Sequence, residues 1–392
     1  MLINFDRIKV APFVFFEYFF RLFPIKKNKV YVSNYMGKGY GDNPKYIVEA
    51  LLKQDSHYDI VWVVKQDYVF PSGVRSVNKN KFFGWLRNIY DQTTARIWID
   101  NCRKETYIRK RKGQYYIQTW HGDLGLKKAE GDAMDTLPAG MRKLGMHDSQ
   151  MANLFIAGNK WIETVYKRAY WYDGEILQCG YPRRDILYSK EASTIQEIRR
   201  KLKINEDVHV VIYVPTFRID ETRKGILGDH VTKFNWEDVL GAFERRFGGK
   251  WIGLVRLHPN VSHLSNQLSL SNNVINVTDY PDINELFLIS DSCISDYSSS
   301  LFEFGVTKKT GFLYAPDMDA YNKERGVYFK NEDIPFPISS SITELINNIE
   351  NFSDEEYLRR HNMFYDGILH MCENGHASEI IASRIEKVCF GR

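Results

Sequence analysis

Residues 292–307 have the sequence SCISDYSSSLFEFGVT, in which a short apolar run passes through a hydroxyl-rich turn into a second apolar segment. The pattern predicts a buried strand over Ser292–Ser295 and a helix over Ser300–Thr307. A buried strand, a short loop and a helix in this order form the repeating unit of an α/β fold with a parallel sheet. The fold of the chain therefore depends on whether this unit recurs on either side.

The same alternation recurs in two blocks. The first block is expected to hold the strands Lys29–Ser33, Asp59–Val64, Arg96–Asp100, Tyr115–Thr119, Leu154–Ala157 and Ile176–Gln178, and the helices Pro44–Lys53, Lys81–Thr94 and Trp161–Tyr170. The second is expected to hold the strands Val208–Val214, Trp251–Leu257, Val274–Val277, Ser292–Ser295 and Gly311–Tyr314, and the helices Asn235–Phe247, Ile283–Ile289, Ser300–Thr307, Ser341–Asn351, Asp354–Tyr365 and Ala377–Phe390. Helix Ile195–Leu202 is predicted to form the crossover between the blocks.

A chain of 392 residues is longer than one ordinary core accommodates. We therefore predict two doubly wound, Rossmann-like α/β domains, over residues 29–202 and 203–392, after an N-terminal segment of residues 1–28. In an open α/β sheet, ligands bind at the carboxyl ends of the strands. The residues that follow each predicted strand are thus the candidates for a functional site.

The overall composition excludes several classes of protein. The 53 basic and 49 acidic side chains leave a net charge of +4, which gives no support to nucleic-acid binding. The five cysteines form no C-x-x-C pair, and their odd number argues against a disulfide framework. A reducing cytoplasm is the simplest setting for such a chain.

Residues 10–24 are rich in phenylalanine and are expected to form an amphipathic helix. The segment is too short to span a bilayer, and it lacks the small-residue cleavage site of a signal peptide. Glu17 and Arg21 share one face, and Lys26, Lys27 and Lys29 follow the segment. This combination favours a helix that lies in a membrane interface. The alternative is a helix that packs on its own protein.

Three stretches at predicted strand ends suit the transfer of an anionic group. In the first, Gln118–Gly122, His121 is placed to take a proton from a hydroxyl nucleophile near neutral pH. The second contains Arg256 and His258, which share one side of a strand and are both suited to contact a phosphate. The alternative for each histidine and for the arginine is a purely structural role.

The third stretch is the serine run of residues 298–300. Serines cap helices, and the exposed N–H groups of a helix N-terminus bind anions. Ser298, Ser299 and Asp296 are therefore predicted to contact a phosphate-bearing donor, with Glu303 one turn into the helix accepting hydrogen bonds from ribose hydroxyls. A plain helix cap, with Glu303 complementing the helix dipole, is the alternative.

Further candidate contacts follow other strands. Thr216 and Arg218 are predicted to touch the donor. For the acceptor, we expect contacts from the glycine-rich loop GKGYGDNP, which is not a Walker loop, and from two lysines near His121. These acceptor residues are Gly37, Lys38, Asp42, Asn43, Lys127 and Lys128. The pair Asp317 and Asp319 matches a D-x-D metal pattern but is too small for us to predict a metal site.

Taken together and in order, these stretches resemble the CDP-glycerol glycerophosphotransferase family. Its members are primases and polymerases of teichoic acid, with relatives that build capsular polymers. The resemblance runs from about Val30 to Ile385, nearly the whole chain. The matching motifs are Val32–Pro44, Trp120-His121-Gly122 with Leu126-Lys127-Lys128, Gly180-Tyr181-Pro182-Arg183, Pro215-Thr216-Phe217-Arg218, Arg256-Leu257-His258-Pro259, Ser290-Asp291 through Asp296-Tyr297-Ser298-Ser299, Tyr321 with Arg325-Gly326, and Asp366-Gly367.

The resemblance implies a GT-B-like architecture, with an N-terminal acceptor domain and a C-terminal nucleotide domain. It implies that glycerol phosphate moves from CDP-glycerol to a hydroxyl of a lipid-linked saccharide or growing polymer, with release of CMP and without a metal or other cofactor. The family's two important histidines fall on His121, as general base, and on His258. With Ser298 and Ser299, His258 would stabilise charge on the diphosphate.

The resemblance also implies a peripheral location on the inner leaflet, at the cytoplasmic face of the cell membrane, because the acceptors are lipid-linked. It does not identify the acceptor, and it does not decide whether the protein adds the first unit, as a primase, or many units, as a polymerase. The oligomeric state also stays open, and a homo-oligomer is one of the possibilities. The family's Trp-His-Gly-Thr-Pro reads Trp-His-Gly-Asp-Leu-Gly in this chain, so that Asp123 stands beside the expected base. A carboxylate there would orient the base and raise its pKa, or mark a different acceptor.

Three alternatives compete with the glycerophosphotransferase hypothesis. The first is a transferase that uses CDP-ribitol. The second is a GT-B glycosyltransferase that uses a nucleotide sugar, because a fold does not settle the chemistry. The third is a membrane-associated binding module that has lost catalysis and would bind the donor without releasing CMP.

Overall fold

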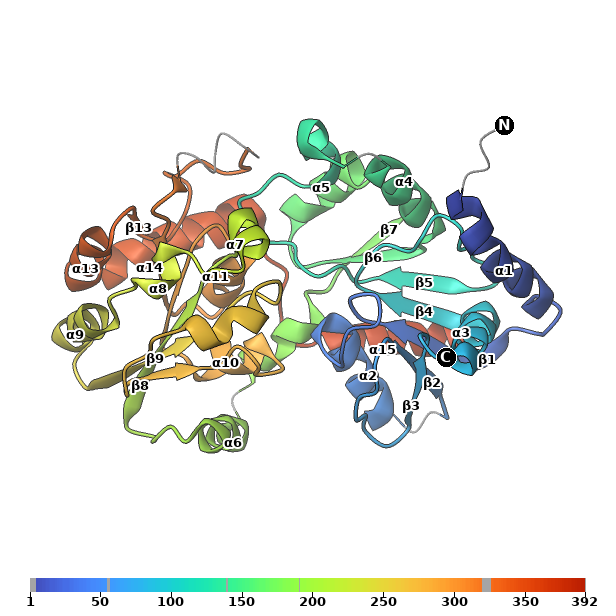
Figure 1. Ribbon diagram of the computed structural model, residues 1–392, viewed down its shortest axis with the longest axis horizontal. Coiled ribbons are helices and arrows are strands. Elements are labelled where there is room, and N and C mark those ends of the chain that lie inside the picture. The colour runs from blue at the N-terminus through green and yellow to red at the C-terminus, as the bar shows by residue number, and fades with distance from the viewer. Residues whose placement is uncertain (1–4, 55–56, 139, 190, 319–325, 392) are drawn as a thin grey trace. The chain divides into compact units, whose positions relative to one another are not determined.

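The computed structural model describes residues 5–54, 57–138, 140–189, 191–318 and 326–391. By its internal contacts the chain forms two compact units. Unit 1 consists of Met1–Asp123, Ala129–Asp185 and Cys372–Arg392, and unit 2 of Leu124–Lys128 and Ile186–Met371. Each unit is an α/β body around one parallel sheet (Figure 1).

Unit 1 contains seven parallel strands in the order β3-β2-β1-β4-β5-β6-β7. The strands are β1 (Lys26–Ser33), β2 (Asp59–Val64), β3 (Val74–Asn78), β4 (Ala95–Asp100), β5 (Tyr115–Gln118), β6 (Leu154–Ala157) and β7 (Glu175–Gln178). The direction of the strand order reverses between β1 and β4. The loops that follow these two strands therefore diverge, and in doubly wound folds ligands bind at this reversal.

The helices of unit 1 cover both faces of its sheet. They are α1 (Phe5–Phe20), α2 (Asp42–Lys53), α3 (Phe82–Thr94), α4 (Met141–Met151), α5 (Lys160–Ala169) and α15 (Ala377–Phe390), with short 3₁₀ segments at Glu130–Thr136 and Pro182–Tyr188. Neighbouring residues of β1 pack into different cores, as the alternation of strand side chains requires. Val30 and Val32 belong to the core with α2 and α15, and Tyr31 belongs to a second core with Met151 of α4.

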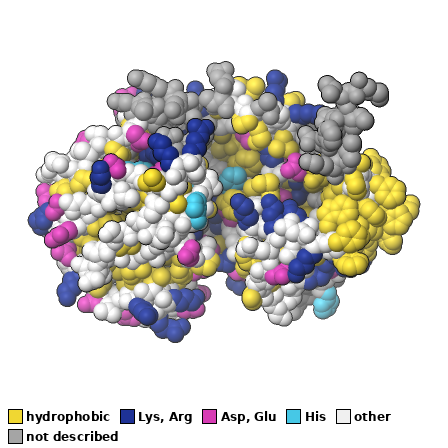
Figure 2. All heavy atoms as spheres, in the orientation of Figure 1, with side chains coloured by type: hydrophobic (Ala, Val, Ile, Leu, Met, Phe, Trp, Pro, Cys, Tyr) yellow, Lys and Arg dark blue, Asp and Glu magenta, His cyan; other side chains and the backbone are white. Residues whose placement is uncertain are grey.

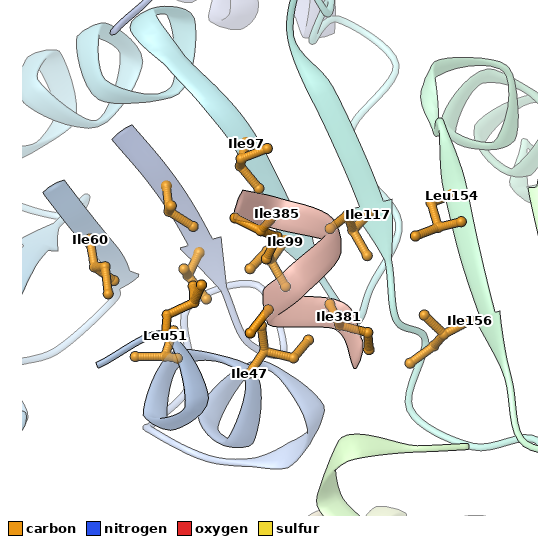
Figure 3. Packing of buried hydrophobic residues seen from close by; sticks show 14 of the residues in the cluster. Ile47, Leu51, Ile60, Ile97, Ile99, Ile117, Leu154, Ile156, Ile381 and Ile385 are labelled. Carbon is orange, nitrogen blue, oxygen red and sulfur yellow. The ribbon is translucent and has the colours of Figure 1, made fainter. Parts of the chain in front are cut away.

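The C-terminal helix α15 belongs to unit 1, which differs from the predicted division at residues 202 and 203. Its buried residues Ile381 and Ile385 pack among Ile47 of α2, Ile97 of β4 and Ile117 of β5 (Figure 3). The chain also leaves unit 1 after Asp185, before the predicted crossover helix α6 (Ala192–Leu202). The apolar stripe of α15 predicts that the helix packs on a core, but a stripe does not identify which of two sheets supplies that core.

Unit 2 contains six parallel strands in the order β10-β9-β8-β11-β12-β13, the Rossmann order, with its reversal between β8 and β11. The strands are β8 (Val208–Val214), β9 (Lys250–Val255), β10 (Val274–Asn276), β11 (Ser292–Ser295), β12 (Thr310–Tyr314) and β13 (Ile338–Ser339). The helices are α6, α7 (Ile219–Lys224), α8 (Asp229–Thr232), α9 (Trp236–Phe247), α10 (Ile283–Ile289), α11 (Ser299–Gly305), α13 (Ile342–Glu350) and α14 (Asp354–Asn362), with a 3₁₀ segment at Ser262–Gln267 and a π-helical one at Met363–Leu369.

The short segment Leu124–Lys128 crosses from unit 1 into unit 2. Lys127 forms an antiparallel bridge with Val327, and the N–H of Tyr328 donates to the Leu126 carbonyl at 2.7 Å. The segment is thereby fixed by backbone hydrogen bonds to unit 2. The predicted acceptor residues Lys127 and Lys128 therefore lie in unit 2, and not with the other predicted acceptor residues in unit 1.

Helix α1 packs along α3 through aromatic rings. Phe16 meets Trp85 edge-on with ring centroids 5.8 Å apart, and Phe20 meets Tyr90 at 5.4 Å. Edge-to-face contacts of this kind stabilise a helix pair beyond simple burial of area. Among the described residues, no helix has both the length and the apolar character needed to cross a bilayer.

Candidate active site

His121 follows β5 on a strained turn. Trp120 adopts a left-handed φ of 56°, which costs a non-glycine residue about 1 kcal/mol or more. The side chain of Asn43 donates to the Trp120 carbonyl at 3.1 Å and so holds the turn in place. The His121 ring stacks on the Trp120 ring with centroids 5.0 Å apart.

The hydrogen bonding of His121 fixes its tautomer. Nδ1 lies 2.7 Å from the carbonyl oxygen of Asn101, which follows β4. A carbonyl only accepts hydrogen bonds, so Nδ1 carries the proton and the lone pair of the neutral ring is on Nε2. Nε2 is thus the atom that can take a proton from a substrate hydroxyl.

The glycine-rich loop after β1 lies beside His121. The N–H of Tyr35 donates to the side-chain oxygen of Asn101 at 2.8 Å, and the Tyr35 ring centroid lies 5.5 Å from that of His121. Tyr35 and Met36 both have left-handed φ angles, of 42° and 56°. Gly37 has a φ of 98°, and a Cβ on it would lie 3.3 Å from the backbone N of Lys65. The loop therefore needs glycine at this position, and backbone strain of this kind clusters at functional sites.

Two of the predicted acceptor residues in this loop already have protein partners. Asp42 pairs with Arg183 at 2.9 Å and accepts from the Tyr35 hydroxyl at 2.6 Å. Asn43 is fully buried, and its side-chain oxygen accepts from the N–H of Arg183 at 3.1 Å. These two residues therefore position the loop and the His121 turn. The exposed Lys38 and the backbone at Gly37 are left as the loop's candidates for direct contact with an acceptor.

Asp123 belongs to a buried ionic cluster that the sequence did not predict. Arg184 donates to both carboxylate oxygens of Asp123, at 2.8 and 2.9 Å, and pairs also with Glu373. All three side chains are about 1% exposed, so no solvent screens their charges. Burial, with a contribution from the nearby Asp123 carboxylate, raises the pKa of Glu373 to about 8. Glu373 is therefore largely protonated at neutral pH.

In unit 2, the loops after β8 and β11 are joined by one network. The Thr216 hydroxyl donates to Asp296 at 2.6 Å, and Arg218 donates to the same carboxylate at 2.8 Å. Arg218 also holds Asp317 through two hydrogen bonds of 2.8 and 2.9 Å, and Asp317 accepts from the Tyr297 hydroxyl at 2.7 Å. The two carboxylates raise the pKa of Arg218 above its usual range.

Because of this network, three residues that were predicted to contact the donor are already bonded within the protein. Thr216, Arg218 and Asp296 are hydrogen-bonded to one another, so they tie together the loops at the strand reversal and hold the residues that follow. The charge of Arg218 is offset by two carboxylates and contributes little net attraction for an anion. Sequence reasoning correctly placed all three at strand ends but did not predict that they bond to each other.

Arg256 is also held by the protein. Its guanidinium donates to the carbonyl of Tyr280 and, at 3.4 Å, to that of Val277. Both carbonyls follow β10, so the side chain ties the ends of two neighbouring strands together. Burial lowers the pKa of Arg256 from its usual value. The structure thus gives Arg256 backbone partners, where the sequence predicted a phosphate contact.

His258 is a neutral hydrogen-bond donor. Its Nδ1 accepts from the N–H of Asn260 at 3.1 Å, so the proton of the neutral ring is on Nε2. Burial and the positive charge of Lys127 lower the pKa of His258 to about 4. The ring lies against Phe217, with centroids 4.6 Å apart. An Nε2–H donor near a lysine is well suited to bind phosphate oxygens.

The serine run lies at the start of α11, close to the segment that carries Lys127. Ser298 caps the helix by accepting from the N–H of Ser300 at 3.2 Å. A Cβ built on Gly125 would lie 3.6 Å from the Cβ of Ser299, so the two backbones approach closely. Glu303 is buried within α11. Unit 2 therefore brings Lys127, His258 and the serine run together, whereas the sequence analysis had placed Lys127 with the acceptor.

Some candidates cannot be placed. Asp319, Tyr321 and Arg325 lie outside the described residues. Within the described ranges, no three His, Cys, Asp or Glu side chains are grouped so that they could hold a metal ion. The side chain of Asp317, the described half of the D-x-D pattern, is engaged by Arg218 and Tyr297.

The sequence from residue 14 to residue 387 matches the family described as CDP-glycerol:poly(glycerophosphate) glycerophosphotransferase. The chain belongs to this family. A teichoic acid poly(glycerol phosphate) polymerase of Staphylococcus epidermidis is 32% identical over 378 residues, which cover 93% of this chain and 51% of that protein. A teichoic acid glycerol-phosphate transferase of Staphylococcus aureus is 32% identical over 377 residues, which cover 92% of this chain and 93% of that protein.

The chain thus spans about half the length of the first of these relatives, and nearly all of the second. Solved structures of the wall teichoic acid polymerase TagF have the same fold. One has a TM-score of 0.82 and 30% identity, and covers 98% of this chain and 95% of that one. A histidine-to-asparagine variant of TagF was also solved after a soak with CDPG.

Proposed function

We propose that the protein transfers glycerol phosphate from CDP-glycerol to a hydroxyl of a lipid-linked saccharide or of a growing teichoic acid polymer, and releases CMP. The observation that carries this proposal is the family match over residues 14–387. Both reported relatives are named for glycerol phosphate, which favours CDP-glycerol over CDP-ribitol or a nucleotide sugar as the donor. The geometry adds that Nε2 of His121 can accept a proton and that Nε2–H of His258 can donate a hydrogen bond to a phosphate oxygen.

In the proposed reaction, Nε2 of His121 takes the proton of the acceptor hydroxyl. The hydroxyl oxygen forms a bond to the β-phosphorus of CDP-glycerol, and the bond from that phosphorus to the bridging oxygen breaks. The bridging oxygen leaves with CMP, and glycerol phosphate stays on the acceptor. Because Nδ1 of His121 is fixed on the Asn101 carbonyl, the ring keeps the correct nitrogen for this proton transfer.

The charge that develops on the diphosphate as CMP leaves needs donors that are already in place. We assign this role to Nε2–H of His258, to Lys127 and to the serine run at α11. Lys127 fits the donor better than the acceptor, because its segment is bonded to unit 2 and its charge acts on His258. In this proposal unit 1 binds the acceptor and unit 2 the nucleotide, as in GT-B-like enzymes.

We also propose that the protein binds peripherally to the inner leaflet of the cell membrane. Large apolar side chains are exposed along α1, and others at the N-terminal turn of α3, against which α1 packs. The most exposed are Phe15 (65%), Leu22 (80%), Phe82 (70%) and Phe83 (82%). The space-filling view shows a large hydrophobic area at the position of α1 (Figure 2). An apolar area of this kind marks a membrane or protein interaction site.

The direct test is CMP release from CDP-glycerol, with CDP-ribitol and UDP-sugars in parallel and a lipid-linked saccharide in detergent as the acceptor. We expect acceptor-dependent CMP release from CDP-glycerol alone. Release from CDP-ribitol alone would contradict the assignment of the donor. UDP release from a sugar donor, with neither CDP-alcohol used, would move the protein to the glycosyltransferase hypothesis.

A further inference from the structure

A cavity of about 540 Å³ lies between α1, the loop over residues 105–109 and α4. All three elements belong to unit 1, and none of them carries a residue of the candidate active site. The cavity borders the helix whose exposed aromatic side chains are proposed to contact the membrane. Its two walls differ in chemical character.

One wall is apolar and comes from α1. Val10, Val14 and Tyr18 line the cavity and are spaced four residues apart, so they form one stripe along the helix. Phe15 and Phe19 follow Val14 and Tyr18 in sequence and are exposed on the adjoining face of the helix. The apolar wall is thus continuous with the exposed aromatic surface of α1.

The other wall is cationic. Lys143 and His147 lie one turn apart on α4, and Arg109 lies in the loop opposite. Arg109 donates to the Ile108 carbonyl at 3.0 Å, and its guanidinium lies 3.2 Å from Nε2 of His147. Besides burial, the charges of Arg109 and Lys143 lower the pKa of His147. Glu105 is the carboxylate among the lining residues, so the lining contains the basic side chains of Arg109 and Lys143 and one acidic side chain.

The docking of α1 builds this cavity. Glu17 is 3% exposed; it pairs with Arg21 at 2.9 Å and accepts from the N–H of Arg109 at 3.2 Å. Arg21 in turn donates to the Arg109 carbonyl at 2.8 Å. These bonds explain why Glu17 and Arg21 interrupt the phenylalanine-rich stretch of residues 10–24. They hold the loop of Arg109 at a fixed distance from α1, and so keep the cationic and apolar walls apart.

We propose that this cavity binds the phosphate headgroup of an anionic membrane phospholipid, a site that deepens the proposed membrane association and rests on it. The phosphate lies between the basic side chains of Arg109 and Lys143, and the guanidinium of Arg109 matches phosphate oxygens in geometry. The glycerol and the first carbons of the acyl chains lie along Val10, Val14 and Tyr18 and lead toward the aromatic surface. A site with one charged end and one apolar end matches an anionic lipid better than it matches a free anion.

The experiment uses the full chain and dihexanoyl phosphatidylglycerol below its micelle concentration, so that no membrane surface is present. Binding is followed through the NMR signals of the His147 ring. We expect a saturable shift in the wild type. Each lost cation should weaken binding by about fivefold, for K143Q alone and again for R109Q/K143Q. If the double variant folds poorly, K143Q alone still tests the proposal, because the Lys143 side chain is exposed and its replacement should not disturb folding.

The matched control is K26Q/K27Q, which removes two exposed cations just after α1. It should bind the short-chain lipid as the wild type does. An equal loss in the control would show that general electrostatic attraction, and not the cavity, holds the lipid. A third variant, V14W, fills the cavity without changing any charge and should abolish the His147 shift.

Other ligands separate the sources of phosphate. Inorganic phosphate and glycerol phosphate should bind about tenfold more weakly or worse, because they lack the apolar part; equal affinity would overturn the lipid assignment. A polyprenyl diphosphate that binds where phosphatidylglycerol does not would also overturn it, and would make the cavity an anchor for the acceptor lipid. The titration involves no turnover, so a failure of CMP release in the wild type would contradict the proposed function separately.

Discussion

At the residue scale, the proposed base is defined by one hydrogen bond. The Asn101 carbonyl holds the proton on Nδ1 of His121, and this leaves Nε2 as the basic atom. We expect H121A to lower CMP release by about two to four orders of magnitude, the usual contribution of a general base. Donor affinity should stay within about twofold, because the proposed donor site is in unit 2. Turnover and equilibrium binding of CDP-glycerol measure the two effects.

His57, which is exposed in unit 1, provides a matched control for this variant. H57A should retain the wild-type rate. A wild-type rate in H121A would exclude His121 as the base, and a parallel loss of donor affinity would indicate that His121 contacts the nucleotide instead.

The low pKa of His258 makes a second prediction at this scale. Burial and the charge of Lys127 lower this pKa to about 4. Removal of the lysine charge in K127M should therefore raise the pKa of His258, because the imidazolium then loses a repulsive neighbour. K128M should have a smaller effect. An NMR pH titration of the His258 ring measures both shifts, and an unchanged pKa in K127M would separate Lys127 from the donor site.

The same pKa gives the direction of the pH dependence of binding. An anionic donor next to His258 favours the imidazolium, so the pKa in the complex lies above the value of about 4 in the free protein. Donor affinity should then rise as the pH falls through the interval between the two pKa values. The Lys127 and His258 variants should both weaken this dependence.

The sequence placed the two histidines shortly after strands, and the structure agrees, with His121 after β5 and His258 after β9. The sequence did not allow the ion pairs around them to be predicted. Arg218 and Asp296 each occupy a strand end, and nothing in a one-dimensional pattern shows that they reach each other at 2.8 Å. Asp42, predicted to bind the acceptor, is likewise paired with Arg183 through a contact distant in sequence.

At the scale of elements, the cluster of Asp123, Arg184 and Glu373 stabilises the places where the chain passes between the units. The three residues lie next to three of the four crossings, after Asp123, after Asp185 and before Cys372; the fourth crossing follows Lys128. Two carboxylates share one guanidinium, and burial raises the pKa of Glu373 from 4.5 to about 8. A carboxyl whose pKa is higher in the folded state stabilises the fold below its unfolded pKa.

This stabilisation is lost as the pH rises from about 4.5 through about 8. The E373Q variant keeps a neutral amide at every pH and cannot show this loss. We expect the free energy of unfolding of the wild type, relative to E373Q, to fall by more than about 1 kcal/mol between roughly pH 5 and pH 9, one pKa unit being about 1.4 kcal/mol. Denaturant unfolding at both pH values measures it. An identical pH profile for the two proteins would refute the raised pKa.

Prediction of the elements succeeded where burial gives a clear pattern. Strands β2, β6, β8 and β11 and helix α10 have the predicted bounds, because each is a short apolar run between polar residues. Five of the described helices and strands were missed. Strand β3 is a largely unburied edge strand and α4 is polar along most of its length, while β13, α7 and α8 have only two, six and four residues. Each is held by its place in the tertiary structure more than by its local sequence.

At the scale of the whole molecule, the chain returns to its first unit at the C-terminus. Ile385 of α15 is fully buried in the core of unit 1. I385A should destabilise this core by about 2–5 kcal/mol, as truncation of a buried isoleucine usually does. Hydrogen exchange should speed up in the amides of β1 and β4, while β8 and β11 should be little affected. The exposed Lys387 gives the control variant K387A, and faster exchange in unit 2 alone would contradict the assignment of α15.

The exposed aromatic surface is the feature by which the whole molecule would meet the membrane. Phe15 and Phe19 lie on α1, Leu22 lies in the turn that follows it, and the three side chains are 65%, 47% and 80% exposed. Each large apolar side chain contributes up to about 1.5–3 kcal/mol when it leaves water, so F15S/F19S/L22S should reduce binding to anionic vesicles by at least about a hundredfold. Co-sedimentation with phosphatidylglycerol vesicles measures the loss.

The control is V69S/I226S/L358S, because these apolar residues are exposed by 95%, 62% and 43% but lie away from α1 in the sequence. We expect the control to sediment with vesicles as the wild type does, because, of the two sets of residues, only that at α1 lies among exposed aromatic rings with a cluster of lysines following. Equal loss of vesicle binding in both triple variants would show that general surface hydrophobicity, and not α1, holds the protein on the membrane.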